Sequence, residues 1–167
     1  MKAPRGYDQI VKTYGDPTPW IMPDGDVQPA WREQILAPVE LPFPLFLAWG
    51  DRRRLDKIYC HRLIATELYL TLEEVKHEVI DKGLALSRKG RKNEYGGCYA
   101  WRPMRGSRKL STHCFGAAID LDPEENRLGE EPTMRREVVE IFERRGWRWG
   151  GRFARLDGMH FQLATGY

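Results

Sequence analysis

Two apolar stripes at helical spacing, together with short strand-like runs, constrain the fold of this chain most strongly. The first stripe predicts a helix from His61 to Lys82 that ends at Gly83; its apolar positions are Ile64, Leu68, Leu72, Val75 and Val79. The second stripe follows Pro132, with Thr133 as the expected N-cap, and ends before Gly146; its apolar positions are Met134, Val138, Ile141 and Phe142. We expect both stripes to pack into the core rather than to bind a cofactor.

Three short runs between and after the stripes have the composition of strands. They are "GCYAWRP" (97–103), "GAAIDLD" (116–122) and "MHFQLA" (159–164). Because strands and helices do not alternate strictly, these runs favour an α+β domain with a small, mainly antiparallel sheet flanked by helices. A chain of 167 residues is long enough for one domain with its own core, so we expect residues 1–167 to form a single domain.

The first 50 residues hold eight of the eleven prolines, which are too many for long regular elements. This composition predicts an irregular, extended wrap over residues 1–56, with one short helix near "PAWREQILAP" (29–38). We expect the wrap to pack on the rest of the domain through its large aromatic side chains, namely Trp20, Trp31, Phe43, Phe46 and Trp49.

Composition excludes several classes of protein. No apolar run approaches the roughly 18 residues of a membrane span, and the first residues, "MKAPRGYDQI", lack the apolar segment of a signal peptide. We therefore expect a soluble protein that is made in the cytoplasm. Three cysteines without a CxxC pair argue against a disulfide framework, and 27 basic against 24 acidic residues leave a net charge of +3, too weak to indicate nucleic acid.

The stretch "KLSTHCFGAAIDLD" (109–122) combines apolar residues with one of the four histidines and two aspartates. A catalytic zinc takes three protein ligands from His, Asp, Glu and Cys, and His113 and Asp120 are candidates for two of them. Because side chains alternate along a strand, Asp120 and Asp122 should point to one face, away from Ile119. The small residues after Gly116 allow the His113 segment to lie close to that face.

A third ligand must come from another part of the sequence. His61 and His77 belong to the first helical pattern, where buried or exposed structural roles suit them. His160 instead begins a short apolar strand and follows Asp157 across Gly158, so both can reach one point in space. One carboxylate as ligand and another as general base is what metal-assisted hydrolysis needs. The spacing alone equally allows a core in which these groups only hydrogen-bond and cap turns.

Two segments resemble signatures of a known family. "STHCFGAAIDLD" (111–122) fits a Ser-x-His-x-x-Gly-x-Ala-x-Asp signature, and "GWRWGGRFARLDGMHFQ" (146–162) is similar to a second, in which Trp-Gly-Gly precedes an acidic residue, two spacers, His and Phe. Both are typical of the zinc peptidases that include D-alanyl-D-alanine carboxypeptidases and dipeptidases and the L-alanyl-D-glutamate endopeptidases of phages and bacteria. The resemblance covers roughly 57–163 and implies the hedgehog and D-alanyl-D-alanine peptidase type of α+β fold.

The resemblance implies a role for each matching residue. His113, Asp120 and His160 match the ligands of one Zn²⁺ per chain, and Asp157 matches the general base. Arg102, upstream of the first signature, matches an arginine that faces the substrate carbonyl, where a guanidinium would stabilise developing negative charge.

Two further positions in the signatures have less defined roles. Ser111 is expected to hydrogen-bond a ligand or a substrate carboxylate, and Trp149 to shape the substrate site together with the glycines that follow it. The first 56 residues match no family motif, so the resemblance leaves their role open.

The expected substrate is bacterial peptidoglycan. Carboxypeptidase and dipeptidase members usually carry Glu at the base position, whereas endopeptidases often carry Asp, so Asp157 favours an L-alanyl-D-glutamate endopeptidase, acting as a monomeric endolysin after phage-type release. A D-alanyl-D-alanine carboxypeptidase and a non-catalytic zinc-binding module of the same fold are the alternatives. A nucleic-acid-binding domain is disfavoured because the basic runs lie in loops and beside acidic residues.

Overall fold

The computed structural model describes residues 2–90, 92–102 and 109–166. Its α-helices are α1 (Tyr7–Tyr14), α2 (Pro29–Ile35), α3 (Ala65–Glu78) and α4 (Arg136–Arg144). Short 3-10 turns are η1 (Thr18–Trp20), η2 (Ile80–Lys82), η3 (Thr112–Phe115) and η4 (Gly150–Arg152). The strands are β1 (Leu36–Leu47), β2 (Arg54–His61), β3 (Glu94–Gly97), β4 (Ala118–Leu121), β5 (Arg148–Trp149) and β6 (His160–Gln162).

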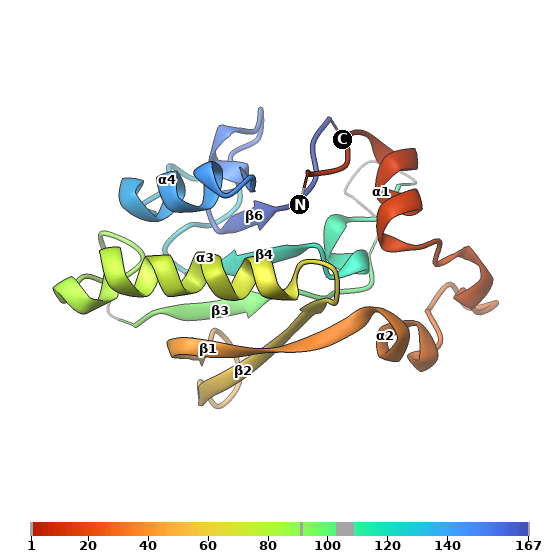
Figure 1. Cartoon of the computed structure of the whole chain (residues 1–167), viewed down its shortest axis with the longest axis horizontal. Helices are drawn as coiled ribbons and strands as arrows, with labels where there is room; N and C mark the ends of the chain where they lie inside the picture. Colours follow the sequence, from red (N-terminus) through yellow and green to blue (C-terminus); the bar gives the residue numbers. More distant parts are fainter. Residues whose placement is uncertain (1, 91, 103–108, 167) are drawn as a thin grey trace.

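All six strands form one sheet in the order β2-β1-β3-β4-β6-β5. Neighbouring strands are antiparallel except for β1 and β3, which run parallel through Phe46 and Leu47. The predicted α+β class with a mainly antiparallel sheet is therefore confirmed. Figure 1 shows α3 lying along the sheet and α4 beside β6. Among the described residues, no helix has both the length and the apolar composition that a bilayer span requires.

The two predicted helices form the apolar layer on this sheet, although both begin later than expected. Leu68, Leu72 and Val75 of α3 are fully buried, and Gly83 has the left-handed φ of 76° that ends this segment after η2. The chain at His61 is still in β2, where it pairs with Leu36 of β1, and its N–H also donates to the Gly116 carbonyl oxygen (2.8 Å).

Helix α4 begins at Arg136, and its N-cap is Arg135, so the predicted cap at Thr133 is wrong. The Thr133 hydroxyl donates to the Glu125 carbonyl oxygen (3.0 Å), and the Thr133 N–H donates to Asn126 Oδ1 (2.8 Å). Thr133 therefore fixes the loop before the helix instead of the helix itself.

The N-terminal region contains the predicted short helix as α2, but the expectation that prolines exclude long elements is wrong. Strand β1 is twelve residues long and contains Pro38, Pro42 and Pro44. The strand tolerates these prolines for two reasons. Its register with β2 shifts between Glu40 and Leu45, and, within the described chain, its other edge pairs with β3 through its last two residues alone. A proline lacking an N–H costs little on an unpaired edge or at a bulge.

The aromatic side chains of this region are not all buried. Trp31 and Phe43 lie in the core, and Trp20 packs against it. Trp49 lies in the turn between β1 and β2 with 53% of its surface exposed, so the expectation that it packs is wrong. A residue at the tip of a two-stranded ribbon has no second layer to cover it.

The strand-like runs were predicted with mixed success. Strands β4 and β6 lie inside the predicted 116–122 and 159–164 segments. The expected strand at 97–103 is wrong over the described residues, since β3 ends at Gly97 and 98–102 are not in the sheet; residue 103 lies outside the described residues. Gly97 has a φ of 112°, and the next N–H, that of Cys98, donates to the Tyr95 hydroxyl (2.8 Å) instead of to a neighbouring strand.

Candidate metal centre

The β4–β6 ladder places two of the predicted ligands directly opposite each other. Asp120 pairs with His160 in the antiparallel register, and His160 Nδ1 lies 3.0 Å from Asp120 Oδ1. His113, from η3, completes the group, because its Nε2 lies 3.1 Å from His160 Nδ1 and 3.2 Å from Asp120 Oδ1. All three residues are buried. The structure therefore brings together three side chains from three segments.

A tight turn positions His113. Ser111 caps η3, where its Oγ accepts a hydrogen bond from the His113 N–H (3.3 Å), and Gly116 ends the turn with a left-handed φ of 62°. A Cβ at position 116 would lie 2.7 Å from Leu36 Cδ2 and 2.9 Å from the His61 nitrogen. The chain can therefore pass from η3 into β4 at this point because residue 116 is a glycine.

Hydrogen bonds on the outer side of the two imidazoles fix which nitrogen faces the centre. His113 Nδ1 lies 3.1 Å from the Cys98 carbonyl oxygen, so in the neutral ring this nitrogen carries the proton and donates. His160 Nε2 lies 2.9 Å from Gln162 Oε1, and the Gln162 amide donates to the Ala164 carbonyl oxygen (3.0 Å). The lone pairs of His113 Nε2 and His160 Nδ1 therefore point toward Asp120.

Three electron-pair donors that face one another at 3.0–3.2 Å require a positive charge between them. For ligand atoms about 2.0–2.1 Å from a tetrahedral zinc, the separation between ligands is about 3.3 Å, close to these distances. A neutral histidine on each side and one carboxylate also match the ligand types that zinc takes in catalytic sites. The donor set of His113, Asp120 and His160 therefore fits a zinc ion.

The electrostatics of the pocket agree with this donor set. Burial alone would raise the pKa of Asp120, but the charges and hydrogen bonds of His113 and His160 outweigh it and lower that pKa. Burial alone would lower the pKa of His160, but the hydrogen bond and charge of Asp120 raise it. Both shifts favour an ionised Asp120 beside a cation.

Asp157 lies beside this group on the loop that leads into β6. Its N–H donates to the Gly150 carbonyl oxygen (2.9 Å), and its own carbonyl oxygen accepts from the His160 N–H (3.1 Å). Within the described chain, Asp157 Oδ1 is buried and has no hydrogen-bond partner. Burial is the main cause that raises the pKa of Asp157, while the charge of His160 lowers it. A buried carboxylate oxygen with spare hydrogen-bonding capacity is suited to accept a proton.

Arg102 is exposed and lies next to η3. Its N–H donates to Cys114 Sγ (3.1 Å), and its carbonyl oxygen accepts from the Ser111 N–H (3.2 Å). These bonds hold the Arg102 backbone against the turn that carries His113. Burial raises the pKa of Asp157, and the Arg102 charge is a smaller cause that opposes this rise, so the guanidinium is within electrostatic reach of the Asp157 carboxylate.

The remaining predicted site residues have structural contacts. Ser111 caps the His113 turn, as described above. The indole N–H of Trp149 donates to the Gly158 carbonyl oxygen (2.9 Å), and the Arg152 guanidinium lies 6.0 Å from the Trp149 ring centroid. A Cβ at Gly150 would lie 2.5 Å from the Asp157 carbonyl oxygen, so this glycine permits the close approach of the loop. Trp149 thus holds the Asp157 loop in place through Gly158.

Sequence reasoning missed two groups that orient the ligands. Gln162 fixes the tautomer of His160, and the signal for it was available, since residues two apart in a strand share a face. The Cys98 carbonyl fixes His113, and no local pattern indicates it. The expectation that Asp122 faces the same way as Asp120 is wrong, because Asp122 has a φ of 46° and its Oδ1 accepts from the Glu94 N–H (2.6 Å).

Comparison with known proteins bears on this site. A family model described as D-alanyl-D-alanine carboxypeptidase matches residues 105–163. The resemblance to this peptidase family is confirmed. No curated protein and no solved structure matches the chain.

The matched segment contains six of the seven predicted site residues, whereas Arg102 lies just before it. The match begins later than residue 57, where we expected the resemblance to begin. It supports a metallopeptidase of the D-alanyl-D-alanine carboxypeptidase type, and the buried His-Asp-His group fits a metal site.

Proposed function

We propose that this chain is a zinc-dependent peptidoglycan peptidase that hydrolyses an amide bond in the stem peptide of the bacterial cell wall. The observation that carries the proposal is the convergence of three lone pairs, from His113, Asp120 and His160, beside the buried Asp157 Oδ1, which has no hydrogen-bond partner among the described residues. When bound, zinc would polarise the scissile carbonyl and make water more acidic. The ligands would be His113 Nε2, Asp120 Oδ1 and His160 Nδ1.

In this proposal, the chain's own residues move the proton and stabilise charge. Asp157 accepts a proton from the attacking water at its free Oδ1 and passes it to the leaving amine. The raised pKa of Asp157 makes its carboxylate a stronger base than an exposed aspartate. The Arg102 guanidinium stabilises the negative charge that develops on the carbonyl oxygen.

Two residues would assist without touching the reacting atoms. Ser111 holds the His113 turn, and its hydroxyl is available in this proposal to a substrate carboxylate. Trp149 would form a wall of the substrate site with its ring face, because its N–H already bonds to Gly158.

Within this class of enzyme, we infer L-alanyl-D-glutamate endopeptidase activity, as in a phage endolysin that acts as a monomer. The support is the aspartate at the base position, where carboxypeptidase relatives usually carry glutamate, together with the net charge of +3, which suits an anionic wall. D-alanyl-D-alanine carboxypeptidase activity is the second candidate, favoured by the description of the matching family model. A non-catalytic zinc module is disfavoured because it would not need Asp157 or Arg102.

The test is digestion of purified peptidoglycan followed by mass spectrometry of the new termini. A new N-terminal D-glutamate establishes the endopeptidase, and free D-alanine establishes the carboxypeptidase. If the zinc-loaded protein creates no new termini, the enzyme proposal is wrong and the zinc module is favoured.

A further inference from the structure

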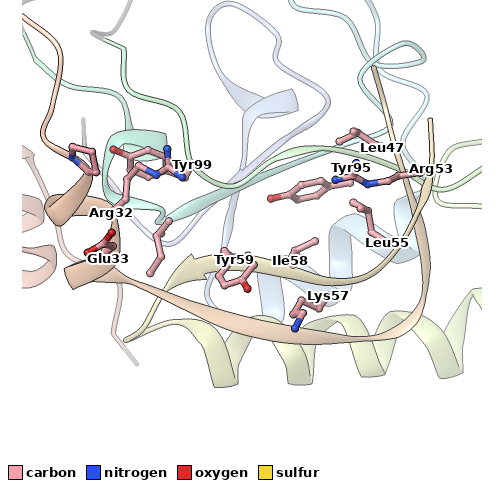
Figure 2. Close-up of a pocket in the computed structure, with 12 residues that line it drawn as sticks. Arg32, Glu33, Leu47, Arg53, Leu55, Lys57, Ile58, Tyr59, Tyr95 and Tyr99 are labelled. Carbon is pink, nitrogen blue, oxygen red and sulfur yellow. The ribbon is translucent and has the colours of Figure 1, made fainter. Parts of the chain in front are cut away.

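The β1–β2 ribbon and β3 diverge on one side of the metal centre and leave a groove between them. Its volume is about 690 Å³. The divergence follows from the sheet topology: in the described chain, β1 pairs with β3 through its last two residues, Phe46 and Leu47, and its earlier residues are not paired with β3. Figure 2 shows side chains from α2, both ribbon strands and the segment after β3 lining this groove. None of them belongs to the candidate metal centre.

The groove is rich in basic and aromatic side chains. Three cationic residues, Arg32, Arg53 and Lys57, line it with one acidic residue, Glu33. Arg53 is weakly paired, since Asp51 lies 3.7 Å away and both side chains are largely exposed. Within the described residues, Arg32 and Lys57 have no carboxylate at ion-pair distance. The groove therefore carries a positive charge that its own residues do not neutralise.

Three tyrosines complete the lining. Tyr59 has half of its surface exposed, and Tyr95 and Tyr99 form the opposite wall. Arg32 lies 5.8 Å from the centroid of the Tyr99 ring, and Figure 2 shows the two side chains together at one end of the groove. In the described part of the chain, the Tyr99 hydroxyl is buried without a hydrogen-bond partner. A polar ligand would supply the missing hydrogen bond.

One short segment separates this groove from the metal centre. Tyr95 and Tyr99 line the groove, whereas the Cys98 carbonyl oxygen between them accepts from His113, and Gly97 pairs with Asp120 across β3 and β4. The two sites therefore lie on opposite sides of residues 95–99. An extended peptide spans about 3.3–3.6 Å per residue, and the proposal requires a stem peptide to reach across this one segment.

We propose that the groove binds an acidic glycan, namely the glycan strand of peptidoglycan with its carboxylate-bearing stems. Aromatic faces pack against sugar rings, and the cations attract the carboxylates. A strand in the groove holds its stem peptides near the metal centre, and this geometry favours a wall glycan over a nucleic acid. The inference rests on the proposed function for the identity of the polymer.

The experiment measures binding separately from hydrolysis. Asp157→Asn protein, loaded with zinc, is sedimented with purified peptidoglycan sacculi from which other wall polymers have been removed. In this background, Lys57→Glu with Tyr59→Ala should weaken binding about tenfold or more, as expected for loss of an aromatic anchor and reversal of a charge. The matched control is Lys89→Glu with Leu63→Ala, which also reverses an exposed lysine and removes a half-exposed apolar side chain outside the groove. The control should bind like the Asp157→Asn parent.

Hydrolysis gives a second readout in the chain with Asp157 intact. The groove variant should cleave intact sacculi more slowly but cleave a short soluble stem peptide at the parental rate. If the groove variant sediments as well as its control, the groove proposal is wrong, whatever the enzyme hydrolyses. If the groove variant loses binding while the parent cleaves no wall, the groove assignment stands and the proposed function fails. Tighter binding of a single-stranded oligonucleotide, or of a polyol phosphate, than of the stripped sacculi overturns the glycan assignment.

Discussion

The β4–β6 ladder and the β1–β2 ribbon belong to one sheet but differ in how regularly their strands pair. The ladder has three residue pairs in unbroken register, and every residue in both of its strands is buried. The ribbon has seven pairs, a register shift, three prolines and an outer face that is largely exposed. The short ladder holds catalytic candidates within about 3 Å of each other, whereas the irregular ribbon leaves room for a groove.

The two regions are nevertheless joined at η3. The Trp31 indole N–H donates to the Cys114 carbonyl oxygen (3.2 Å), and the His61 N–H donates to the Gly116 carbonyl oxygen (2.8 Å). The first residues also return to the end of the chain, where the Gly6 N–H donates to the Thr165 carbonyl oxygen (2.7 Å). Helix α2 and the ribbon therefore support the turn that carries His113, even though the family match begins after them.

The largest effect is expected from removing two donors of the metal centre. The His113→Ala, His160→Ala protein should lose its zinc and all measurable hydrolysis, because Asp120 alone cannot replace a three-ligand set. Elemental analysis should give about one zinc per parent chain and almost none for the variant. His77→Ala, which removes an exposed histidine on α3, is the control and should keep its zinc. Stoichiometric zinc in the double variant would show that the ligands lie elsewhere.

The next largest effect concerns Asp157. Asp157→Asn should keep the fold and the zinc but lower turnover about 10²–10⁴-fold, the usual range for removing a general base. Asp157→Glu should retain part of the activity, because a longer carboxylate still accepts a proton. The measurements are loss of turbidity of a peptidoglycan suspension and metal content, with the exposed Asp56→Asn as control. An asparagine variant that lyses walls at the parental rate with zinc bound makes Asp157 a turn residue.

A smaller effect is expected from Arg102, which lies just outside the ladder region. Arg102→Ala should lower turnover about 100-fold without changing zinc content, because an oxyanion donor acts on the transition state. Lysine at this position should restore little, since it lacks the planar guanidinium. Arg136→Ala removes an exposed arginine of α4 and should have no effect on kcat. If Arg102→Ala leaves kcat unchanged, Arg102 has no role in catalysis.

The ladder region could largely be predicted from the sequence, whereas the ribbon could not. His113 and Asp120 have a short-range signal, because they and the glycine between them lie within one stretch, whereas His160 lies in a second stretch and was assigned through the resemblance to a family signature. Helices α3 and α4 have clear apolar periodicity. Both short strands, β4 and β6, lie in predicted strand segments. Their antiparallel pairing places Asp120 opposite His160, so that these two side chains meet.

The ribbon could not be predicted because its structure depends on long-range pairing. Strand β1 reaches its full length because its pairing with β2 accommodates the prolines of β1 and a register shift. The local sequence of β1 does not indicate this pairing. Burial of Trp49 was expected from its residue type, but its exposure is set by the tip of the ribbon. Helix α1 was also missed, although Ile10 and Tyr14 are spaced four residues apart and are both buried. Eight residues are too few for a reliable periodic pattern.

The smallest effect compares two glycines, one from each region, that have the same positive φ. Gly116, between η3 and β4, and Gly50, in the β1–β2 turn, both have a φ of 62°. An alanine in this left-handed region costs about 1–2 kcal/mol through its Cβ alone, so both Gly→Ala variants should be destabilised by that amount. At Gly50 no atom lies within 4 Å of the new Cβ, whereas at Gly116 the Cβ would meet Leu36 and the His61 backbone.

Gly116→Ala should therefore cost a further ~1–3 kcal/mol, the usual penalty for overpacking, and lower the Tm by several degrees more than Gly50→Ala does. Thermal unfolding of the zinc-loaded proteins, followed by circular dichroism, measures the difference. Zinc affinity should fall for Gly116→Ala alone, because the shift of η3 moves His113 away from Asp120 and His160. Equal Tm values and equal zinc affinities for the two variants would contradict this prediction. They would mean that Leu36 and the His61 backbone move to accommodate the new Cβ, and that the position of His113 does not depend on close packing between Gly116 and the ribbon.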